Sequence, residues 1–93
     1  MTLLDLIKNL AKLDPELTIY AKKPWQLDSE AVAALPDPDE RPVPPELEAQ
    51  GFRYFLEVSV ATEFAEGWRS TKLLPPTSKK LCDRLIQYAI NDA

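Results

Sequence analysis

The spacing of hydrophobic positions changes several times along the chain, and each spacing predicts a different element. Leucine and isoleucine recur every three or four residues over 2–13, which is the spacing of one face of an α-helix. Thr2 is placed to cap this helix, and Asp5 lies in its first turn, where an acidic side chain suits the helix dipole. Pro15 excludes the helical conformation at Asp14, so the helix is expected to end there.

Three segments show the alternation of apolar and polar residues that is typical of β-strands. Residues 17–22 form the first, and 30–35 form a weaker strand that Pro36 ends. The clearest alternation covers 52–60 and predicts the central strand of the sheet. The connection between the first two strands is too short for a helical crossover, so we expect them to pair as an antiparallel hairpin.

Two helices are predicted after the central strand. Thr62 is expected to cap the first, which continues to Thr71. The sequence Leu73-Leu74-Pro75-Pro76 predicts a turn, after which Thr77 or Ser78 caps the last helix. The apolar face of this last helix is expected to comprise Leu81, Cys82, Leu85, Ile86, Ala89 and Ile90.

The elements together predict one α+β domain that includes all residues 1–93. Ninety-three residues are enough for one domain and not for two. The order helix, three strands, two helices indicates a small, mostly antiparallel three-stranded sheet with helices packed on one face.

Residues 36–51, hereafter the acidic segment, interrupt this order. They contain five of the nine prolines, and five acidic residues against one arginine give them a net charge of −4, which equals that of the whole chain. Such a segment can neither pair into a sheet nor bury a core, so we expect an extended, acidic surface loop. A helical turn is expected near Pro45, and Gly51 is expected to end the segment.

Composition excludes several classes of enzyme. The chain has no histidine and a single cysteine, so it lacks Ser-His and Cys-His nucleophiles, histidine zinc ligands and an internal disulfide. Two glycines do not make the usual phosphate-binding loops. The carboxylates of 28–30 and 37–39 lie in polar segments, where we expect them to be solvated rather than catalytic. We therefore expect no catalytic residue, no cofactor and no metal, and a buried Cys82.

Charge and hydropathy restrict the partners and the compartment. The net charge of −4 and the absence of a basic face argue against nucleic acid. No apolar run approaches the ~20 residues of a membrane helix, and Asp5 interrupts the first apolar stretch, unlike a signal peptide. We expect a cytoplasmic protein that binds neither nucleic acid nor membrane and whose acidic surface attracts a basic protein partner.

Aromatic residues are the best candidates for contacts with that partner. Trp25 follows Pro24 in a loop, where a tryptophan either anchors an interface or covers the edge of the sheet. Tyr20 and Phe55 are predicted on the strand faces opposite the core, beside Arg53. They would form an exposed apolar patch, unless the acidic segment covers it. The charged rim of this surface is expected to comprise Asp28, Asp37, Asp39 and Glu40.

Residues 20–31, YAKKPWQLDSEA, and the closing residues 90–93, INDA, resemble small uncharacterised bacterial proteins of the immunity-protein type. The resemblance covers a small part of the chain and contains no catalytic motif. It implies an acidic, cytoplasmic, non-enzymatic protein that masks a toxin or another partner, and it carries no site residue over. The main expectation is a protein-binding module of the immunity or adaptor type. A homodimeric scaffold and a small enzyme with a pocket at a dimer interface are the alternatives.

Overall fold

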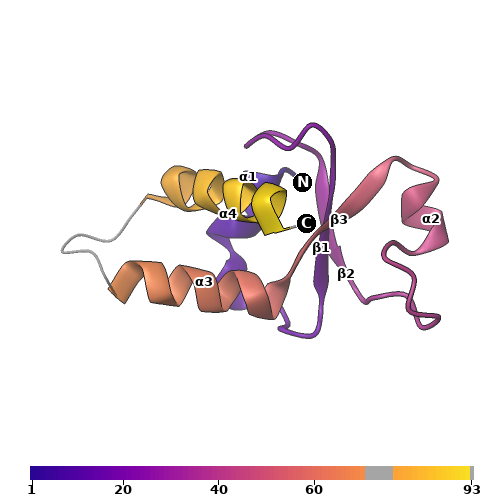
Figure 1. Cartoon of the computed structure of the whole chain (residues 1–93), viewed down its shortest axis with the longest axis horizontal. Helices are drawn as coiled ribbons and strands as arrows, with labels where there is room; N and C mark the ends of the chain where they lie inside the picture. Colours follow the sequence, from indigo (N-terminus) through magenta and orange to yellow (C-terminus); the bar gives the residue numbers. More distant parts are fainter. Residues whose placement is uncertain (71–76, 93) are drawn as a thin grey trace.

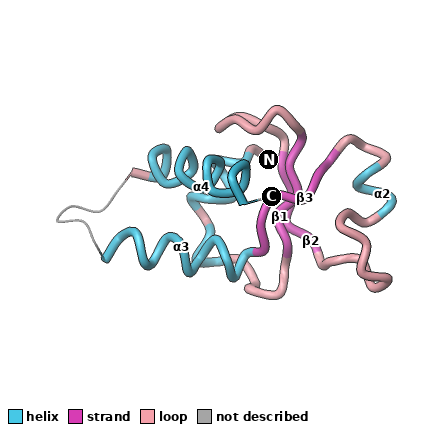
Figure 2. The backbone as a smooth tube through the Cα atoms, in the orientation of Figure 1, coloured by secondary structure: helices cyan, strands magenta, loops and turns pink. Residues whose placement is uncertain are grey.

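The computed structural model of the chain describes residues 1–70 and 77–92. Its elements are, in chain order, α1 (Leu3–Lys8), the 3₁₀ helix η1 (Leu10–Lys12), β1 (Thr18–Lys22), β2 (Ala31–Ala34), α2 (Pro45–Glu48), β3 (Phe52–Glu57), α3 (Val58–Ser70) and α4 (Ser78–Asp92). The strands form an antiparallel sheet in the order β2-β1-β3. Helices α1, α3 and α4 lie on one face of the sheet, and α2 lies on the other (Figures 1 and 2). The predicted α+β fold is confirmed.

The first helix begins where the sequence predicts and ends earlier. The Thr2 hydroxyl accepts the Asp5 N–H at 3.1 Å, and the Asp5 carboxylate accepts the Thr2 N–H at 3.1 Å. Hydrogen bonding of the Asp5 carboxyl by the Thr2 backbone, assisted by the Thr2 side chain, holds its pKa below the usual value. The α-helix ends after Lys8, where the side-chain amide of Asn9 donates to the backbone carbonyl of Asp5 at 2.9 Å. The chain then continues as η1.

The central strand is β1, and the prediction that 52–60 form it is wrong. β3 lies at an edge and ends at Glu57, and α3 begins at Val58. Thr62 therefore lies inside α3 and does not cap it. Packing explains the difference, because Val58, Ala61 and Ala65 are buried at helical spacing against the core. This burial overrides the strand preference of the β-branched residues after Glu57.

An extra residue in β3 shifts its pairing with β1. Ile19 pairs with Leu56, whereas Tyr20 pairs with Tyr54, so Phe55 has no partner on β1. This is a β-bulge, in which two residues of one strand lie opposite one residue of the other. As a result Phe55 and Leu56 both pack into the cluster beneath the helices. The prediction that Phe55 shares a face with Tyr20 is wrong, because the bulge interrupts the period of two.

The sheet separates two hydrophobic clusters. The main core lies between the sheet and the helices and includes Ile19, Ala21, Phe55 and the apolar faces of α1, α3 and α4. The second cluster lies on the opposite face and consists of Tyr20, Val43 and Phe52, with Val32, Ala34 and Leu47 packed against it. Both faces of this small sheet are therefore covered.

The acidic segment forms the cover of the second cluster. Val43 is 5% exposed and Tyr20 beneath it is 1% exposed. The carboxylate of Asp37 accepts the N–H groups of Asp39 at 3.2 Å and Arg41 at 3.3 Å, which fixes the start of the segment. The prediction that the segment buries no core is wrong, and the alternative in which it covers the second face is confirmed.

Local signals within and after the acidic segment are confirmed. The helical turn α2 starts at Pro45, and Gly51 has a φ of 95°, which glycine adopts readily. At the start of α4 the Thr77 hydroxyl accepts the Lys80 N–H at 3.2 Å. The apolar face of α4 is buried except for Ile90. The turn predicted at 73–76 lies outside the described residues.

Replacing Val43 tests whether the acidic segment is packed on the sheet. Val43→Ala removes two buried methyl groups, so we expect the free energy of unfolding to fall by about 1 to 3 kcal/mol. Proteolytic cleavage within 36–51 should become faster at the same time. Leu35→Ala, at a position that is 65% exposed, is the control and should change stability by no more than about 0.5 kcal/mol. Equal stability of wild type and Val43→Ala in chemical denaturation would contradict this packing.

Candidate contact surface around Trp25

The loop between β1 and β2 holds Trp25 against the main core. Its ring meets the Phe55 ring edge-on, with centroids 5.0 Å apart and an interplanar angle of 89°. The indole Nε1 donates to the Ala21 carbonyl at 3.2 Å. The Ser29 hydroxyl donates to the Pro24 carbonyl at 3.0 Å across the loop. Trp25 is thus half-buried and fixed on two sides, while part of its ring reaches the surface.

Two hollows flank Trp25. The first has a volume of about 260 Å³ and is lined by Lys23, Pro24, Trp25 and Ile90. The second has a volume of about 410 Å³ and lies between the loop and α4, with Asp28, Asp83 and Gln87 in its lining. These seven residues are called the Trp25 surface below. Its centre is apolar, because Ile90 is 53% exposed beside the proline and the indole.

Charged groups surround this apolar centre. The Lys23 ammonium lies over the Trp25 ring, 4.9 Å from its centroid. The carboxylates of Asp28 and Asp83 are exposed. Among residues 1–70 and 77–92, the only salt bridge joins Lys22 to Glu30, at 2.9 Å, so it involves neither of these two carboxylates. Both carboxylates therefore remain open to a cationic group from outside.

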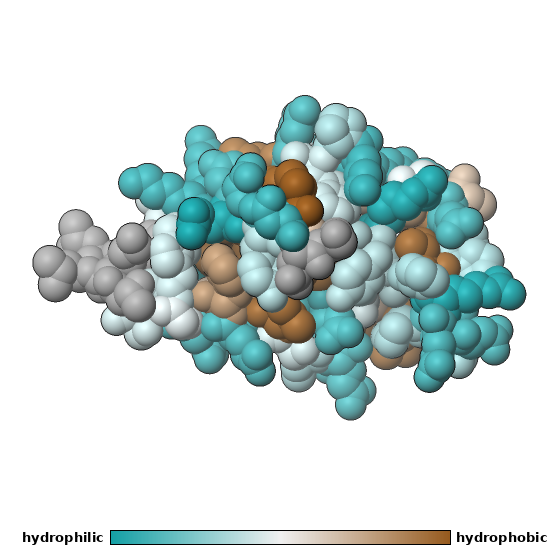
Figure 3. Space-filling view, in the orientation of Figure 1, coloured by the Kyte–Doolittle hydropathy of each residue, from teal (hydrophilic) through white to brown (hydrophobic). Residues whose placement is uncertain are grey.

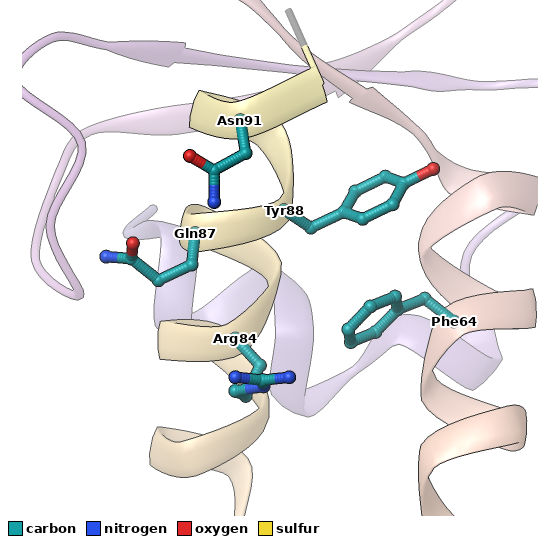
Figure 4. A pocket seen from close by; sticks show the side chains of 5 residues that line it. All are labelled: Phe64, Arg84, Gln87, Tyr88 and Asn91. Carbon is teal, nitrogen blue, oxygen red and sulfur yellow. The ribbon is translucent and has the colours of Figure 1, made fainter.

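A third hollow lies between α3 and α4, with a volume of about 280 Å³. In Figure 4 the rings of Phe64 and Tyr88 approach each other across the two helices, with centroids 5.2 Å apart. Gln87 and Asn91 project from another side of α4. The side-chain amides of Gln87 and Asn91 and the guanidinium of Arg84 supply hydrogen-bonding groups to this hollow. Its described lining residues include no acid–base pair. It can hold a polar group, and Gln87 links it to the Trp25 surface.

The structure brings together only part of the predicted contact set. Trp25 and Asp28 lie on one surface, as described above. Phe55 is 1% exposed and supports Trp25 from below instead of contacting solvent. Tyr20 lies in the second cluster on the opposite face of the sheet. The predicted exposed patch of Tyr20, Phe55 and Arg53 is therefore absent, since Arg53 pairs with Ala21 and lies on the other face from Tyr20.

The predicted charged rim is divided in the same way. Asp39 and Glu40 are exposed in the acidic segment, and Asp37 is half-buried with its carboxylate bonded to the backbone of that segment. The acidic segment lies on the sheet face opposite the helices, and hydrophilic surface dominates that end of the molecule in Figure 3. Asp28 alone of the predicted rim borders Trp25.

Ile90 is the residue of the Trp25 surface whose exposure the sequence analysis does not predict. The sequence predicts this residue on the buried face of the last helix. Successive residues of an α-helix are rotated by about 100° around its axis. On this basis Ile90 lies at one end of the arc of apolar positions that begins at Leu81 and includes Leu85 and Ala89. Its position at the edge of the apolar arc could therefore have indicated an exposed side chain. Asp83 and Gln87 lie on the same side of α4, and no pattern in the sequence marks them as residues of an exposed contact surface.

Two buried titratable groups, Cys82 and Tyr20, lie in separate clusters on opposite faces of the sheet. Cys82 is fully buried, and burial, assisted by the charge of Asp83, raises the pKa of its thiol to about 12. Burial likewise raises the pKa of the Tyr20 hydroxyl. Among the described residues no group of His, Cys, Asp and Glu side chains is placed to hold a metal ion. The prediction that Cys82 is buried is confirmed.

The reactivity of Cys82 tests this part of the core. At pH 8 a thiol with a pKa of about 12 is ionised in about one molecule in ten thousand. We expect no reaction with a thiol reagent in the folded protein and rapid reaction once guanidinium unfolds the chain and the pKa returns to about 8.5. At every pH from 7 to 9 the folded chain should be labelled far more slowly than the unfolded chain, although ionisation of the thiol rises with pH in both. Rapid labelling of the folded chain at pH 8 would contradict the buried position.

None of the helices in the described ranges is long and apolar enough to cross a membrane. Comparison of the chain with protein-family models, with curated proteins and with solved structures finds no match.

Proposed function

We propose that the chain is a non-enzymatic protein-binding module and that a basic protein partner contacts its Trp25 surface. The observation that carries the proposal is the exposed Ile90 side chain, which forms one apolar hollow with Pro24 and Trp25. Interfaces concentrate their binding energy on such apolar and aromatic positions inside a polar rim. Because Phe55 and the Ala21 carbonyl already fix the Trp25 ring, little of its conformational freedom is lost on binding.

Charge supports a basic partner. The exposed carboxylates of Asp28 and Asp83 border the apolar hollow. The acidic segment adds a net charge of −4. Its packing on the second cluster holds these charges in place. Fixed negative charge steers a basic protein toward this one and raises the association rate at low salt.

The resemblance to bacterial immunity-type proteins agrees with this proposal. Such a protein masks its partner by covering it, and needs no catalytic group of its own. A cytoplasmic location and an immunity or adaptor role belong to the same proposal. The hollows around Trp25 lie open at the surface, which suits a protruding side chain of a partner better than an enclosed reaction site.

Capture of the partner by the full chain tests the proposal. The tagged protein is used at low salt in extracts of the native host, together with Ile90→Asp, Trp25→Ala and Ala11→Asp. We expect one stoichiometric basic protein that Ile90→Asp no longer retains. Trp25→Ala should weaken binding by about 2 kcal/mol or more, which is about 30-fold. Ala11→Asp introduces the same charge at an exposed position of η1 and should bind like wild type.

Selective loss, rather than capture itself, is the decisive result. Ile90 is exposed, so Ile90→Asp should unfold at the same denaturant concentration as wild type, and this is measured in parallel. Binding should also fall steeply between 0.05 and about 0.5 M salt, as expected for charge steering. Equal capture by Ile90→Asp and Ala11→Asp would contradict the proposal. A homodimer in analytical ultracentrifugation without any captured protein would favour the scaffold alternative.

A further inference from the structure

The outer edge of β2 is only partly covered. The Lys22 N–H donates to the Glu30 carbonyl at 3.0 Å, so Glu30 and every second residue after it turn their backbone groups toward β1. The residues between them turn their groups outward. The Ala31 N–H donates outward to the Met1 carbonyl at 2.8 Å. The next outward N–H is that of Ala33, which has no hydrogen-bond partner in the described part of the chain.

The N-terminal residues of the chain already pair with one end of this edge. Thr2 pairs with Glu30 in an antiparallel bridge outside β2. The Leu3 N–H donates to the Ser29 carbonyl at 2.8 Å beside it. This pairing covers residues 29–31 and leaves the edge at Ala33 open.

A groove lies along the open part of the edge. It has a volume of about 480 Å³, and Ala31, Val32 and Ala33 are part of its lining. Leu13 and Leu17 line it from the side of the main core, whereas Leu47 and Phe52 line it from the side of the second cluster. The groove therefore straddles the edge of the sheet. Alternate side chains of an extended segment in it would point to opposite sides.

Both sides of the groove are lined by apolar residues, and exposed carboxylates lie beside one of them. Leu13 and Leu17 make the side of the main core apolar. On the other side Leu47 of α2 lines the groove, and its neighbours in the acidic segment, Glu46 and Glu48, carry exposed carboxylates next to it. A segment that alternates apolar with lysine or arginine residues would match both sides at once.

We propose that the open edge of β2 binds an extended segment of a basic partner as a fourth, antiparallel strand. The Ala33 N–H and carbonyl pair with the backbone of that segment, its apolar side chains pack on Leu13 and Leu17, and its basic side chains face α2. Strand addition of this kind derives affinity from backbone hydrogen bonds and specificity from the flanking side chains. The inference rests on the proposed function only for the basic character of the partner.

A second copy of the chain fits this edge less well. Two-fold pairing of β2 with β2 would bring together two acidic segments, each with a net charge of −4. Like charges placed opposite one another across a sheet edge repel. The covering contact between Met1 and Ala31 would also meet the incoming edge strand. A single basic segment avoids the repulsion, and it can end before the contact between Met1 and Ala31.

A titration with defined peptides tests the inference. The probe is a pool of capped eight-residue peptides that alternate Lys or Arg with Val, Ile, Leu or Phe, added to the isotope-labelled full chain. We expect the Ala33 amide resonance to shift to saturation and its hydrogen exchange to slow at least tenfold. A pool with Glu or Asp in place of Lys and Arg should cause no shift at Ala33.

Methylation of backbone nitrogens provides a matched control. Residues directly opposite each other in an antiparallel pair share a face, and Ala33 faces the main core. The peptide residues that donate to β2 are therefore the apolar ones. N-methylation of the apolar residues should weaken binding at least tenfold, whereas N-methylation of the basic residues should leave it within a factor of two.

A variant of the chain tests the same hydrogen bond from the other side. Ala33→Pro removes the outward N–H and leaves the hydrogen bonds to β1, which suits proline at a strand edge. It should lose peptide binding at least tenfold, and Ala33→Ser should retain it. Should Ala33→Pro fail to fold, the comparison of the two N-methylated pools still decides.

Several results would overturn the inference. They are the absence of a saturable shift at Ala33 with the basic pool, equal binding by the two N-methylated pools, and a dimer that Ala33→Pro abolishes, which would assign the edge to a second copy.

The two proposals can be contradicted separately. Capture that is lost with Ile90→Asp and unchanged with Ala33→Pro would contradict the strand addition alone. Peptide binding at Ala33 with unchanged capture by Ile90→Asp would contradict the role of the Trp25 surface alone.

Discussion

The β-bulge at Phe55 is the constraint on which the rest of the structure depends. With regular pairing, the side chains of β3 would alternate strictly, and Phe55 would face away from Leu56. The bulge brings both side chains into the main core. One consequence is a flat aromatic support for Trp25, whose indole rests edge-on against Phe55. Another is that Phe52 and Tyr20 gather on the opposite face, where the acidic segment covers them.

This arrangement gives the short sheet two covered faces and two kinds of exposed feature. Val43 fixes the acidic segment, so its carboxylates surround one face at defined positions instead of moving on a free loop. On the other face, the helices leave Ile90 exposed beside Trp25. The outer edge of β2 stays open between the two. Apolar contact, charge and an unpaired strand edge are the features that protein recognition uses, and here they lie around one sheet.

Local signals predicted much of the fold from the sequence. The capping pair Thr2 and Asp5, the proline that starts α2 and the hydroxyl of Thr77 each act over three or four residues, and each is where the sequence places it. The antiparallel pairing of β1 with β2 also follows from the short connection between them.

Features that depend on distant residues could not be predicted. The alternation from Phe52 onward contains no mark of the bulge, because the extra residue is defined by its partner strand. The alternation also continues through Val58 and predicts a strand there. In the structure α3 begins at Val58, which is buried against the core with the next turns of that helix. Of the candidate contact residues, Trp25 and Asp28 lie together at the surface of their loop. Phe55 lies on the face opposite to the predicted one because of the bulge. Tyr20 lies on the predicted face but is buried there by the acidic segment.

Distances between aromatic protons in solution test the central role of the bulge most directly. In a nuclear Overhauser spectrum of the full chain, we expect contacts of the Phe55 ring with the Trp25 indole, and of the Tyr20 ring with Phe52 and the Val43 methyl groups. The same spectrum should show close Tyr20 and Tyr54 backbone protons across the strands. Contacts of the Tyr20 ring with the Phe55 ring, and none with Val43, would show regular pairing of β3 and would contradict this account.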